Sequence, residues 1–221
     1  FDRFEDLFLS LQEQGILTRF ALNFFPHTPA KVVLEELDGV PLVTFTSTPT
    51  NALALAWKRL LDVVLAALLL AIALPVVLAI ALLVRISSSG AVLFRQTRCG
   101  LNGRLFTLYK FRTMTSDAHE GRAEVEHLNE MGGPVSKVKN DPRVTRLGRL
   151  LRKFSLDELP QLWNVLKGDM SLVGPRPPIP EEVAGYDPGQ PRRLSMKPGL
   201  TCLWQVHGRN ELDFRSWIDL D

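Results

Sequence analysis

Residues 63–84 constrain the fold of this chain more than any other stretch, because these 22 residues carry no charged or strongly polar side chain. A helix of that length rises roughly 33 Å at about 1.5 Å per residue, which matches a bilayer hydrocarbon core of about 30 Å. No face of the run is polar, which argues against a buried helix of a soluble protein. The run is therefore predicted to enter a membrane.

Pro75 divides this run and opens an alternative to a simple span. Proline removes a backbone donor and clashes with the preceding turn, so a helix through it kinks or breaks. Basic residues, which mark the cytoplasmic side, flank both ends: Lys58 and Arg59 before the run, Arg85 after it. Two arms of 12 and 10 residues would each reach about half way across the bilayer. These residues leave open a re-entrant helix broken at Pro75 and an ordinary kinked span.

Residues 1–56 have the pattern of a short α/β piece. Apolar residues at helical spacing over 4–11, followed by Gly15, predict a helix, and 16–24 and 40–45 predict strands. Seven acidic and three basic residues give this part a net charge of −4, against +6 from Lys58 onward. We expect the end of an α/β domain that starts upstream, with a scaffold or dimerisation role and different partners from the rest.

Two cysteines, Cys99 and Cys202, are present. They are too few for a disulfide framework, and their spacing does not fit a metal site. Both are expected to be free thiols in a reducing compartment.

Two basic segments follow the apolar run. Residues 91–94 and 105–109 predict short strands around a polar turn, and the segment KFRTM behind them can bind phosphate oxygens or lie as solvated surface. Residues 137–153 hold seven basic residues against one acid, with arginines recurring every three residues among apolar ones. This pattern predicts a basic amphipathic helix. An anionic membrane surface, nucleic acid and packing on the domain are alternatives, and the neighbouring bilayer segment favours lipid.

The segment from Ser155 to Glu158 is the densest chemical signal. Its S-x-x-E spacing fits a capping box, in which the acids do no chemistry. Pro160 follows closely, so the helix can instead begin after the acids and display Asp157 and Glu158 at its N-terminus. A carboxylate there can attack phosphorus, while the second acts on protons or holds Mg²⁺, and the helix dipole would favour the ionised acid.

Two stiff turns downstream each fix a cation. Arg176 lies between prolines in Gly-Pro-Arg-Pro, and Lys197 begins Lys-Pro-Gly. Several cations could therefore converge on a diphosphate, which together with the acids describes a phosphoryl-transfer site.

Five motifs occur in order along the chain: Lys58-Arg59-x-x-Asp62, the apolar run, KFRTM, NDPRVTRLGRLLRKFSLDELPQLWNVLKGDMSLVGPRP and KPGLTCLWQVHGRN. In order and spacing they resemble the bacterial sugar transferase family, the monotopic polyprenyl-phosphate sugar-1-phosphate transferases. The resemblance covers the chain from about Trp57 to its end. Two positions depart from the family pattern: Leu74 precedes the proline where serine is usual, and Cys202 stands where glycine is usual.

The resemblance implies a two-step exchange. Asp157 attacks the sugar-bearing phosphate of a UDP-sugar and releases UMP, and polyprenyl (undecaprenyl) phosphate then accepts the phosphosugar. Glu158 is implied as the partner acid, and both carboxylates as ligands of Mg²⁺. The basic residues implied to hold phosphate or nucleotide are Arg112, Arg176, Lys110, Lys197 and Arg209.

The implied fold is α+β: a mostly helical, membrane-associated catalytic domain with a re-entrant membrane helix broken at Pro75, behind the remnant of an α/β Rossmann-like domain. The expected boundaries are 1–50 for the remnant, 51–57 for a linker, 58–86 for the membrane helices and 87–221 for the catalytic domain. Sequence is expected to be missing at both ends. Asp157 must meet a lipid phosphate at the cytoplasmic face of the bacterial inner membrane, which favours the re-entrant form.

The expected partners are UDP-sugar, polyprenyl phosphate, inner-membrane lipids and a second copy of the chain, and no nucleic acid. Two rival functions fit the same residues. One is a non-catalytic membrane-anchored scaffold, and the other is a UDP-sugar hydrolase that uses water as the acceptor.

Overall fold

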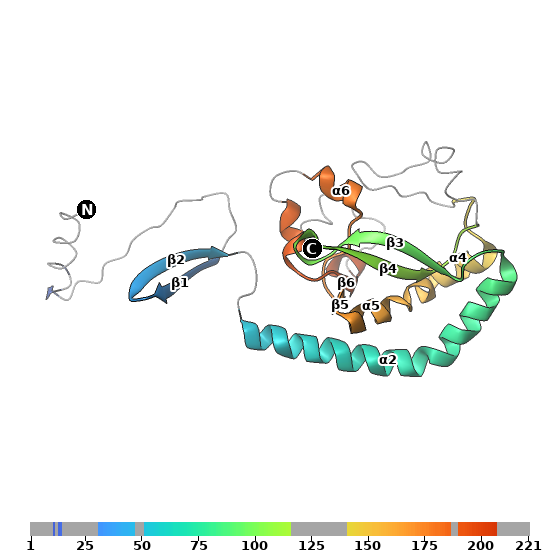
Figure 1. Ribbon diagram of the computed structural model, residues 1–221, viewed down its shortest axis with the longest axis horizontal. Coiled ribbons are helices and arrows are strands. Elements are labelled where there is room, and N and C mark those ends of the chain that lie inside the picture. The colour runs from blue at the N-terminus through green and yellow to red at the C-terminus, as the bar shows by residue number, and fades with distance from the viewer. Residues whose placement is uncertain are drawn as a thin grey trace. The chain divides into compact units, whose positions relative to one another are not determined.

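The computed structural model describes residues 11, 13–14, 31–46, 51–115, 141–186 and 190–206. The chain divides into two compact units, residues 1–47 and 48–221 (Figure 1). Each unit is considered by itself.

The described part of the first unit is an antiparallel hairpin of β1 (Lys31–Leu37) and β2 (Val40–Thr46). Asp38 and Gly39 join the strands with φ of 50° and 79°, the left-handed backbone that a two-residue hairpin turn requires. The strand predicted at 40–45 is confirmed. The strand predicted at 16–24, and nearly all of the helix predicted before it, lie outside the described residues. The Rossmann-like assignment is not confirmed, because that fold is built on a parallel sheet.

Helix α2 (Ala52–Ser87) opens the second unit and is the longest element described. Asn51 caps it, since its side chain accepts a hydrogen bond of 3.0 Å from the amide of Ala54. Residues 52–57 of the predicted linker 51–57 are therefore helical: a good N-cap followed by alanines and leucines starts the helix six residues before Lys58.

Pro75 lies inside α2, and the helix continues through it. The predicted break into two separate helices is thus wrong. Proline removes one intrahelical hydrogen bond, which a long helix accommodates by bending while the bonds on either side persist. Figure 1 shows this bent course of α2.

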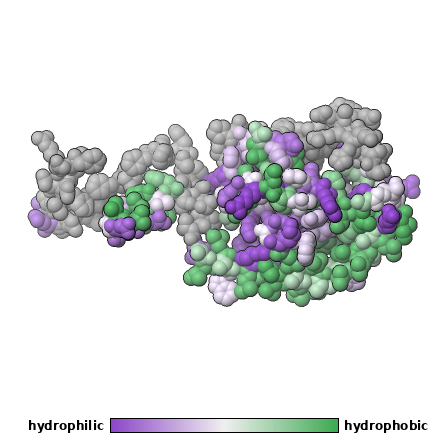
Figure 2. Space-filling view, in the orientation of Figure 1, coloured by the Kyte–Doolittle hydropathy of each residue, from purple (hydrophilic) through white to green (hydrophobic). Residues whose placement is uncertain are grey.

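Most of α2 is exposed although it is apolar. Only Asp62, Ala66, Ile80 and Val84 are buried among its 36 residues. By length and composition the helix could cross a membrane, and 11% of its most apolar 18-residue window is buried. Figure 2 shows hydrophobic residues gathered along this helix. A core helix would be covered on all sides, so the exposed apolar surface favours contact with lipid.

The remainder of the second unit combines a β-hairpin with short helices. Strands β3 (Leu93–Cys99) and β4 (Leu105–Phe111) pair antiparallel, which confirms the predicted strand pair and extends it. Strands β5 (Ser171–Val173) and β6 (Gly199–Thr201) pair in parallel. The helices are η1 (Leu101–Gly103), α4 (Arg146–Lys153), η3 (Leu156–Glu158), α5 (Gln161–Lys167), α6 (Pro180–Ala184), η4 (Gln190–Ser195) and α7 (Leu203–Val206).

Helix α4 is shorter than the basic helix predicted over 137–153. Thr145 caps it by accepting a hydrogen bond of 2.9 Å from the amide of Gly148. Arg143 precedes the helix and forms an ion pair of 2.6 Å with Asp141. The helix-forming pattern is therefore interrupted by the cap, and residues 137–140 lie outside the described part of the chain.

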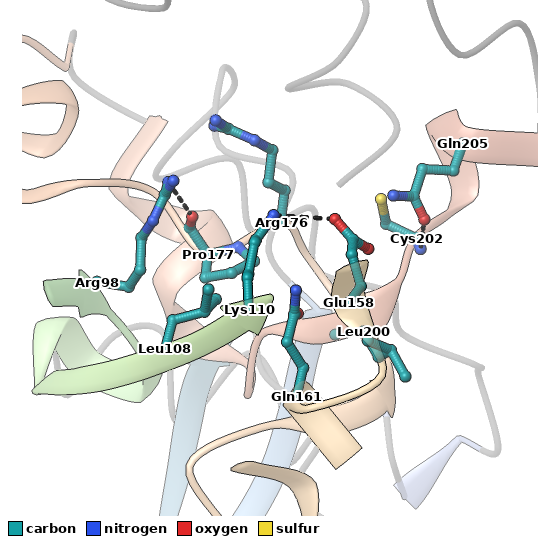
Figure 3. A pocket seen from close by; sticks show the side chains of 11 residues that line it. Arg98, Leu108, Lys110, Glu158, Gln161, Arg176, Pro177, Leu200, Cys202 and Gln205 are labelled. Atoms are coloured by element: carbon teal, nitrogen blue, oxygen red, sulfur yellow. Dashed lines mark hydrogen bonds and ion pairs between the residues drawn. The ribbon is translucent and has the colours of Figure 1, made fainter. Parts of the chain in front are cut away.

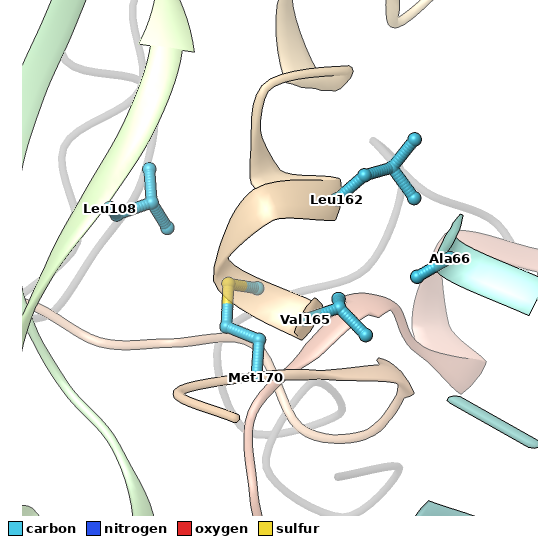
Figure 4. Packing of buried hydrophobic residues seen from close by; sticks show 5 residues of the cluster. All are labelled: Ala66, Leu108, Leu162, Val165 and Met170. Atoms are coloured by element: carbon cyan, nitrogen blue, oxygen red, sulfur yellow. The ribbon is translucent and has the colours of Figure 1, made fainter. Parts of the chain in front are cut away.

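Two buried clusters join α2 to the rest of its unit. Ala66 of α2 packs with Leu108 of β4, Leu162 and Val165 of α5, and Met170 (Figure 4). The second cluster lies near the other end of α2 and comprises Ile80, Val84, Phe111 and Leu151. Each fully buried aliphatic side chain stabilises the fold by roughly 1.5–3 kcal/mol. Both arms of the apolar helix are therefore held against the same body.

Polar contacts fasten the N-terminal part of α2. Asp62 is 6% exposed and accepts hydrogen bonds from the Ser171 hydroxyl at 2.8 Å and the Leu172 amide at 3.1 Å. Lys58 completes this set through an ion pair of 3.2 Å with Asp62. Arg59 donates to the carbonyl oxygens of two α5 residues, at 2.7 and 2.9 Å. The Lys-Arg-x-x-Asp motif thus holds α2 to α5 and β5.

Candidate active site

The acid pair lies on η3, between α4 and α5. Ser155 has a left-handed backbone with φ of 55°, and its side chain forms no helix-capping hydrogen bond. The Ser155 amide donates to the Arg152 carbonyl at 3.2 Å rather than to Glu158, whose carboxylate accepts from the Lys110 ammonium at 2.9 Å. The capping-box alternative is therefore wrong, and the acids are available for other chemistry.

Asp157 is 7% exposed. Burial raises the pKa of its carboxyl group above the ordinary value. The positive charge of Lys110 lowers this pKa, the negative charge of Glu158 raises it, and the positive charge of Arg152 lowers it. The dominant influence is thus desolvation rather than the helix dipole invoked from the sequence. A carboxylate that has lost its water shell is poorly stabilised, and a nearby lysine and arginine favour its charged form.

A pocket opens beside this pair and includes the Lys110–Glu158 ion pair in its wall (Figure 3). Its volume is about 140 Å³, smaller than the roughly 300–1,000 Å³ of a site that encloses a whole small-molecule ligand. The described lining residues are Arg98, Leu108, Lys110, Glu158, Gln161, Arg176, Pro177, Gly199, Leu200, Cys202 and Gln205. Asp157 is not in this lining, although its neighbour Glu158 is.

The two stiff turns predicted to present cations lie side by side. The Gly199 amide donates to the Pro175 carbonyl at 2.8 Å, and the Gly174 amide donates to the Thr201 carbonyl at 3.1 Å. A Cβ on Gly174 would stand 2.3 Å from the Lys197 carbonyl oxygen, so only glycine allows this approach. The packing fixes the Gly-Pro-Arg-Pro turn and places Arg176 in the pocket wall.

Glu182 of α6 holds the Arg176 side chain. Its carboxylate is buried and accepts from the Arg176 guanidinium at 3.0 and 3.5 Å. The described residues therefore bring Lys110, Glu158 and Arg176 into one pocket wall, and Asp157 lies near Lys110 and Glu158.

Other predicted site residues lie elsewhere. Arg112 donates to the carbonyl and hydroxyl oxygens of Ser88, at 2.8 Å each, and so secures the chain just after α2. Lys197 is near Arg59, Asp62 and Asp169. Its pKa is lowered mainly by burial and, to a smaller extent, by the positive charge of Arg59. Neither is in the described pocket wall. Arg209 lies outside the described residues.

Arg98 of β3 is a pocket cation that the sequence did not single out. Its guanidinium donates to the Pro177 carbonyl at 2.9 Å and to the Gln96 side chain at 2.7 Å. Exposed and covered residues alternate along β3, so Gln96 and Arg98 share its covered face. A cation on the covered face of a strand is unusual, and extending the predicted strand beyond residue 94 would have revealed it.

The acid pair fits the magnesium ion implied by the resemblance. Mg²⁺ takes oxygen ligands and often binds through one or two carboxylates together with substrate phosphates. Asp157 and Glu158 supply such oxygens beside a cation-lined pocket. Within the described part of the chain, no group of three or more His, Cys, Asp or Glu residues converges. The fit therefore depends on phosphate oxygens as further ligands.

As predicted, neither Cys99 nor Cys202 forms a disulfide, and both are buried. Cys202 contributes to the pocket wall at the position where the family pattern has glycine.

Comparison with known proteins decides the family. The family model described as "Bacterial sugar transferase" matches residues 53–221. The chain belongs to this family. The match begins at the start of α2 and includes both the acid pair and the pocket.

Several curated relatives are similar to most of this chain. Galactosyl transferase CpsE of Streptococcus agalactiae is 39% identical, covering 98% of this chain and 49% of CpsE. Exopolysaccharide production protein ExoY of Rhizobium meliloti is 40% identical over 82% of this chain and 81% of ExoY. UDP-glucose:undecaprenyl-phosphate glucose-1-phosphate transferase of Klebsiella pneumoniae is 40% identical over 81% of this chain and 37% of that protein. The chain thus spans about half the length of CpsE and less of the Klebsiella protein.

Proposed function

We propose that this protein transfers a sugar-1-phosphate from a UDP-sugar to polyprenyl (undecaprenyl) phosphate, the step that starts synthesis of a surface polysaccharide. The names of the relatives support the reaction class. The observation that carries the proposal is the placement of a buried aspartate next to a pocket that holds Lys110, Glu158 and Arg176. That arrangement suits attack on a phosphate group.

The first step forms a bond between a carboxylate oxygen of Asp157 and the phosphorus that carries the sugar. The bond from that phosphorus to the bridging oxygen breaks, and UMP leaves with the electron pair. The attack requires the Asp157 side chain to reach the pocket that Glu158 lines. In the second step an oxygen of polyprenyl phosphate attacks the same phosphorus and expels the Asp157 carboxylate, which gives a polyprenyl-diphosphate sugar.

The neighbouring residues stabilise charge during both steps. Lys110 lies next to both acids and favours the ionised form of Asp157. Glu158 fixes the Lys110 ammonium and can handle protons of the entering or leaving phosphate. Mg²⁺, held by Asp157, Glu158 and substrate phosphates, would neutralise negative charge on the diphosphate.

The two clusters on α2 support a re-entrant arrangement in the membrane. Ala66 and Val84 are separated by about 27 Å of helix, at about 1.5 Å per residue, and both are buried against the same body. A helix that crossed the bilayer would draw charged elements of this body to membrane depth, at high cost. This supports a bent, re-entrant α2 with both ends on one face, surrounded by inner-membrane lipids. That face is the cytoplasmic one, where UDP-sugars are available, and the first unit is proposed to mediate a homodimer.

A UMP-release assay tests the proposal. The purified protein is mixed with a panel of UDP-sugars, Mg²⁺ and polyprenyl phosphate, and UMP is measured with and without the lipid. The proposal expects lipid-dependent release with at least one UDP-sugar, which also names the sugar. Lipid-independent release would instead identify the hydrolase, and no release from any UDP-sugar would favour the scaffold.

A further inference from the structure

Two arginine side chains come close together in the pocket. Arg98 and Arg176 reach it from β3 and from the Gly-Pro-Arg-Pro turn. Figure 3 shows their guanidinium groups to one side of Lys110 and the Glu158 carboxylate to the other. Among the described residues, the Arg98 Nε is buried without a hydrogen-bond partner. Because this nitrogen is buried, a ligand would instead bind the two terminal nitrogens, each of which keeps one donor hydrogen besides its bond to Pro177 or Gln96.

The charge balance of the pocket points to an anion. Burial, and next the positive charge of Arg176, lower the pKa of Arg98 to about 10, while Glu182 opposes the shift. Two like charges held near each other in a partly dehydrated site repel, and an anion bound between them offsets this repulsion. Glu182 is already committed to Arg176 and Glu158 to Lys110. The pocket therefore keeps excess positive charge.

We infer that Arg98 acts with Arg176 as a diphosphate-binding clamp, which holds the phosphate of the departing UMP while the sugar-bearing phosphate faces the acids. This inference rests on the proposed function. A guanidinium group can donate two parallel hydrogen bonds to one phosphate, so two arginines suit a group with several oxygens. The positive charge of the two arginines stabilises the departing UMP phosphate in the transition state.

Glu182 acts as the positioning residue of this clamp. Its buried carboxylate fixes the orientation of Arg176, whereas the Pro177 carbonyl and Gln96 fix Arg98. Because both arginines are oriented before substrate arrives, little side-chain freedom is lost when the diphosphate binds.

Kinetics of Arg98→Gln test the inference, with Arg95→Gln as the matched control. Arg95 lies on the same strand, is exposed and stands 6.0 Å from the centre of the Tyr109 ring. Arg98→Gln is expected to raise the KM for UDP-sugar about ten- to hundredfold, as for the loss of hydrogen bonds to a charged group, and to leave the KM for polyprenyl phosphate unchanged. Arg95→Gln is expected to change neither. Unchanged KM for UDP-sugar, or a rise confined to polyprenyl phosphate, would overturn the inference.

Calorimetric binding of UDP, without any turnover, separates this inference from the proposed function. Wild-type protein is expected to bind UDP, and Arg98→Gln to bind it about ten- to hundredfold more weakly. UDP binding that depends on Arg98 in a protein that releases no UMP would sink the function and keep the clamp. Equal binding by both proteins would sink the clamp. If Arg98→Gln does not fold, Arg98→Lys replaces it, because lysine keeps the positive charge but lacks the forked guanidinium group. Arg98→Lys is also expected to bind UDP more weakly than the wild type. Wild-type affinity for UDP in this variant would contradict the clamp.

Discussion

Two buried aspartates occupy opposite roles in this protein. Asp62 on α2 is 6% exposed and Asp157 on η3 is 7% exposed, so burial does not distinguish them. Asp62 receives hydrogen bonds from an amide, a hydroxyl and an ammonium group. Asp157 is instead desolvated, with a raised pKa and a neighbouring lysine. The comparison teaches that the partners of a buried acid, not its burial, separate a structural aspartate from one that can react.

Asp157→Asn gives the largest expected effect. The amide keeps the volume of the side chain but cannot attack phosphorus, so kcat should fall by a factor of about 10³ or more. UDP binding measured by calorimetry should persist, because the cations of the pocket wall are unchanged. Wild-type turnover in this variant would return the acid to a structural role.

Asp62→Asn should instead act on stability. It removes the charge from a carboxylate with three partners and should lower the free energy of unfolding by about 2–3 kcal/mol. Thermal unfolding in detergent measures the loss, with the exposed Glu181→Gln as control, where a change within about 0.5 kcal/mol is expected. A stable but inactive Asp62→Asn protein would break the contrast between the two aspartates.

Lys110→Gln sharpens the account of Asp157. Without the ammonium group, the pKa of Asp157 should rise further, so the acid limb of the kcat/KM profile should move to higher pH. Part of the lost activity should then return as the pH is raised. The control is Lys153→Gln on α4, since Lys153 lies over the exposed Phe154 ring and is not among the groups that shift the pKa of Asp157. An unshifted acid limb would show that a different group controls it.

The pH dependence of stability provides the smallest effect. The pKa of Asp157 is higher in the folded than in the unfolded protein, so folding favours the protonated carboxyl group. The wild type therefore loses stability as the pH rises from the unfolded-state pKa of about 3.9 through the folded-state pKa. Asp157→Asn does not lose stability in this way, so it should be more stable than the wild type at neutral pH when a chelator is present. Below the unfolded pKa the two should agree. A variant that is less stable at neutral pH would contradict desolvation of Asp157.

Local patterns predicted much of this fold. The apolar composition of residues 63–84 indicated α2, and alternation with a polar turn indicated the pairing of β3 with β4. The break at Pro75 was wrong because a long helix tolerates one missing hydrogen bond, and the helix starts before residue 58 because Asn51 caps it. Both differences concern how far a helix propagates, which depends on its whole length.

The candidate site was predicted in part. Lys110, Glu158 and Arg176 do meet in one pocket, because their motifs lie at element ends that packing brings together. Arg112 binds Ser88 and Lys197 lies near Arg59, since the direction of a side chain depends on tertiary packing that spacing does not specify. Arg98 was missed because the strand predicted over 91–94 ended before it.

Trapping of the covalent intermediate tests whether Asp157 is the nucleophile. The protein is mixed with a productive UDP-sugar and Mg²⁺ in the absence of polyprenyl phosphate, quenched in acid, digested and analysed by mass spectrometry. The account predicts a phosphosugar on the peptide that contains Asp157, and its disappearance when polyprenyl phosphate is added before the quench. A protein that transfers sugar phosphate to the lipid with no adduct on this peptide, or with the adduct on another residue, would contradict it.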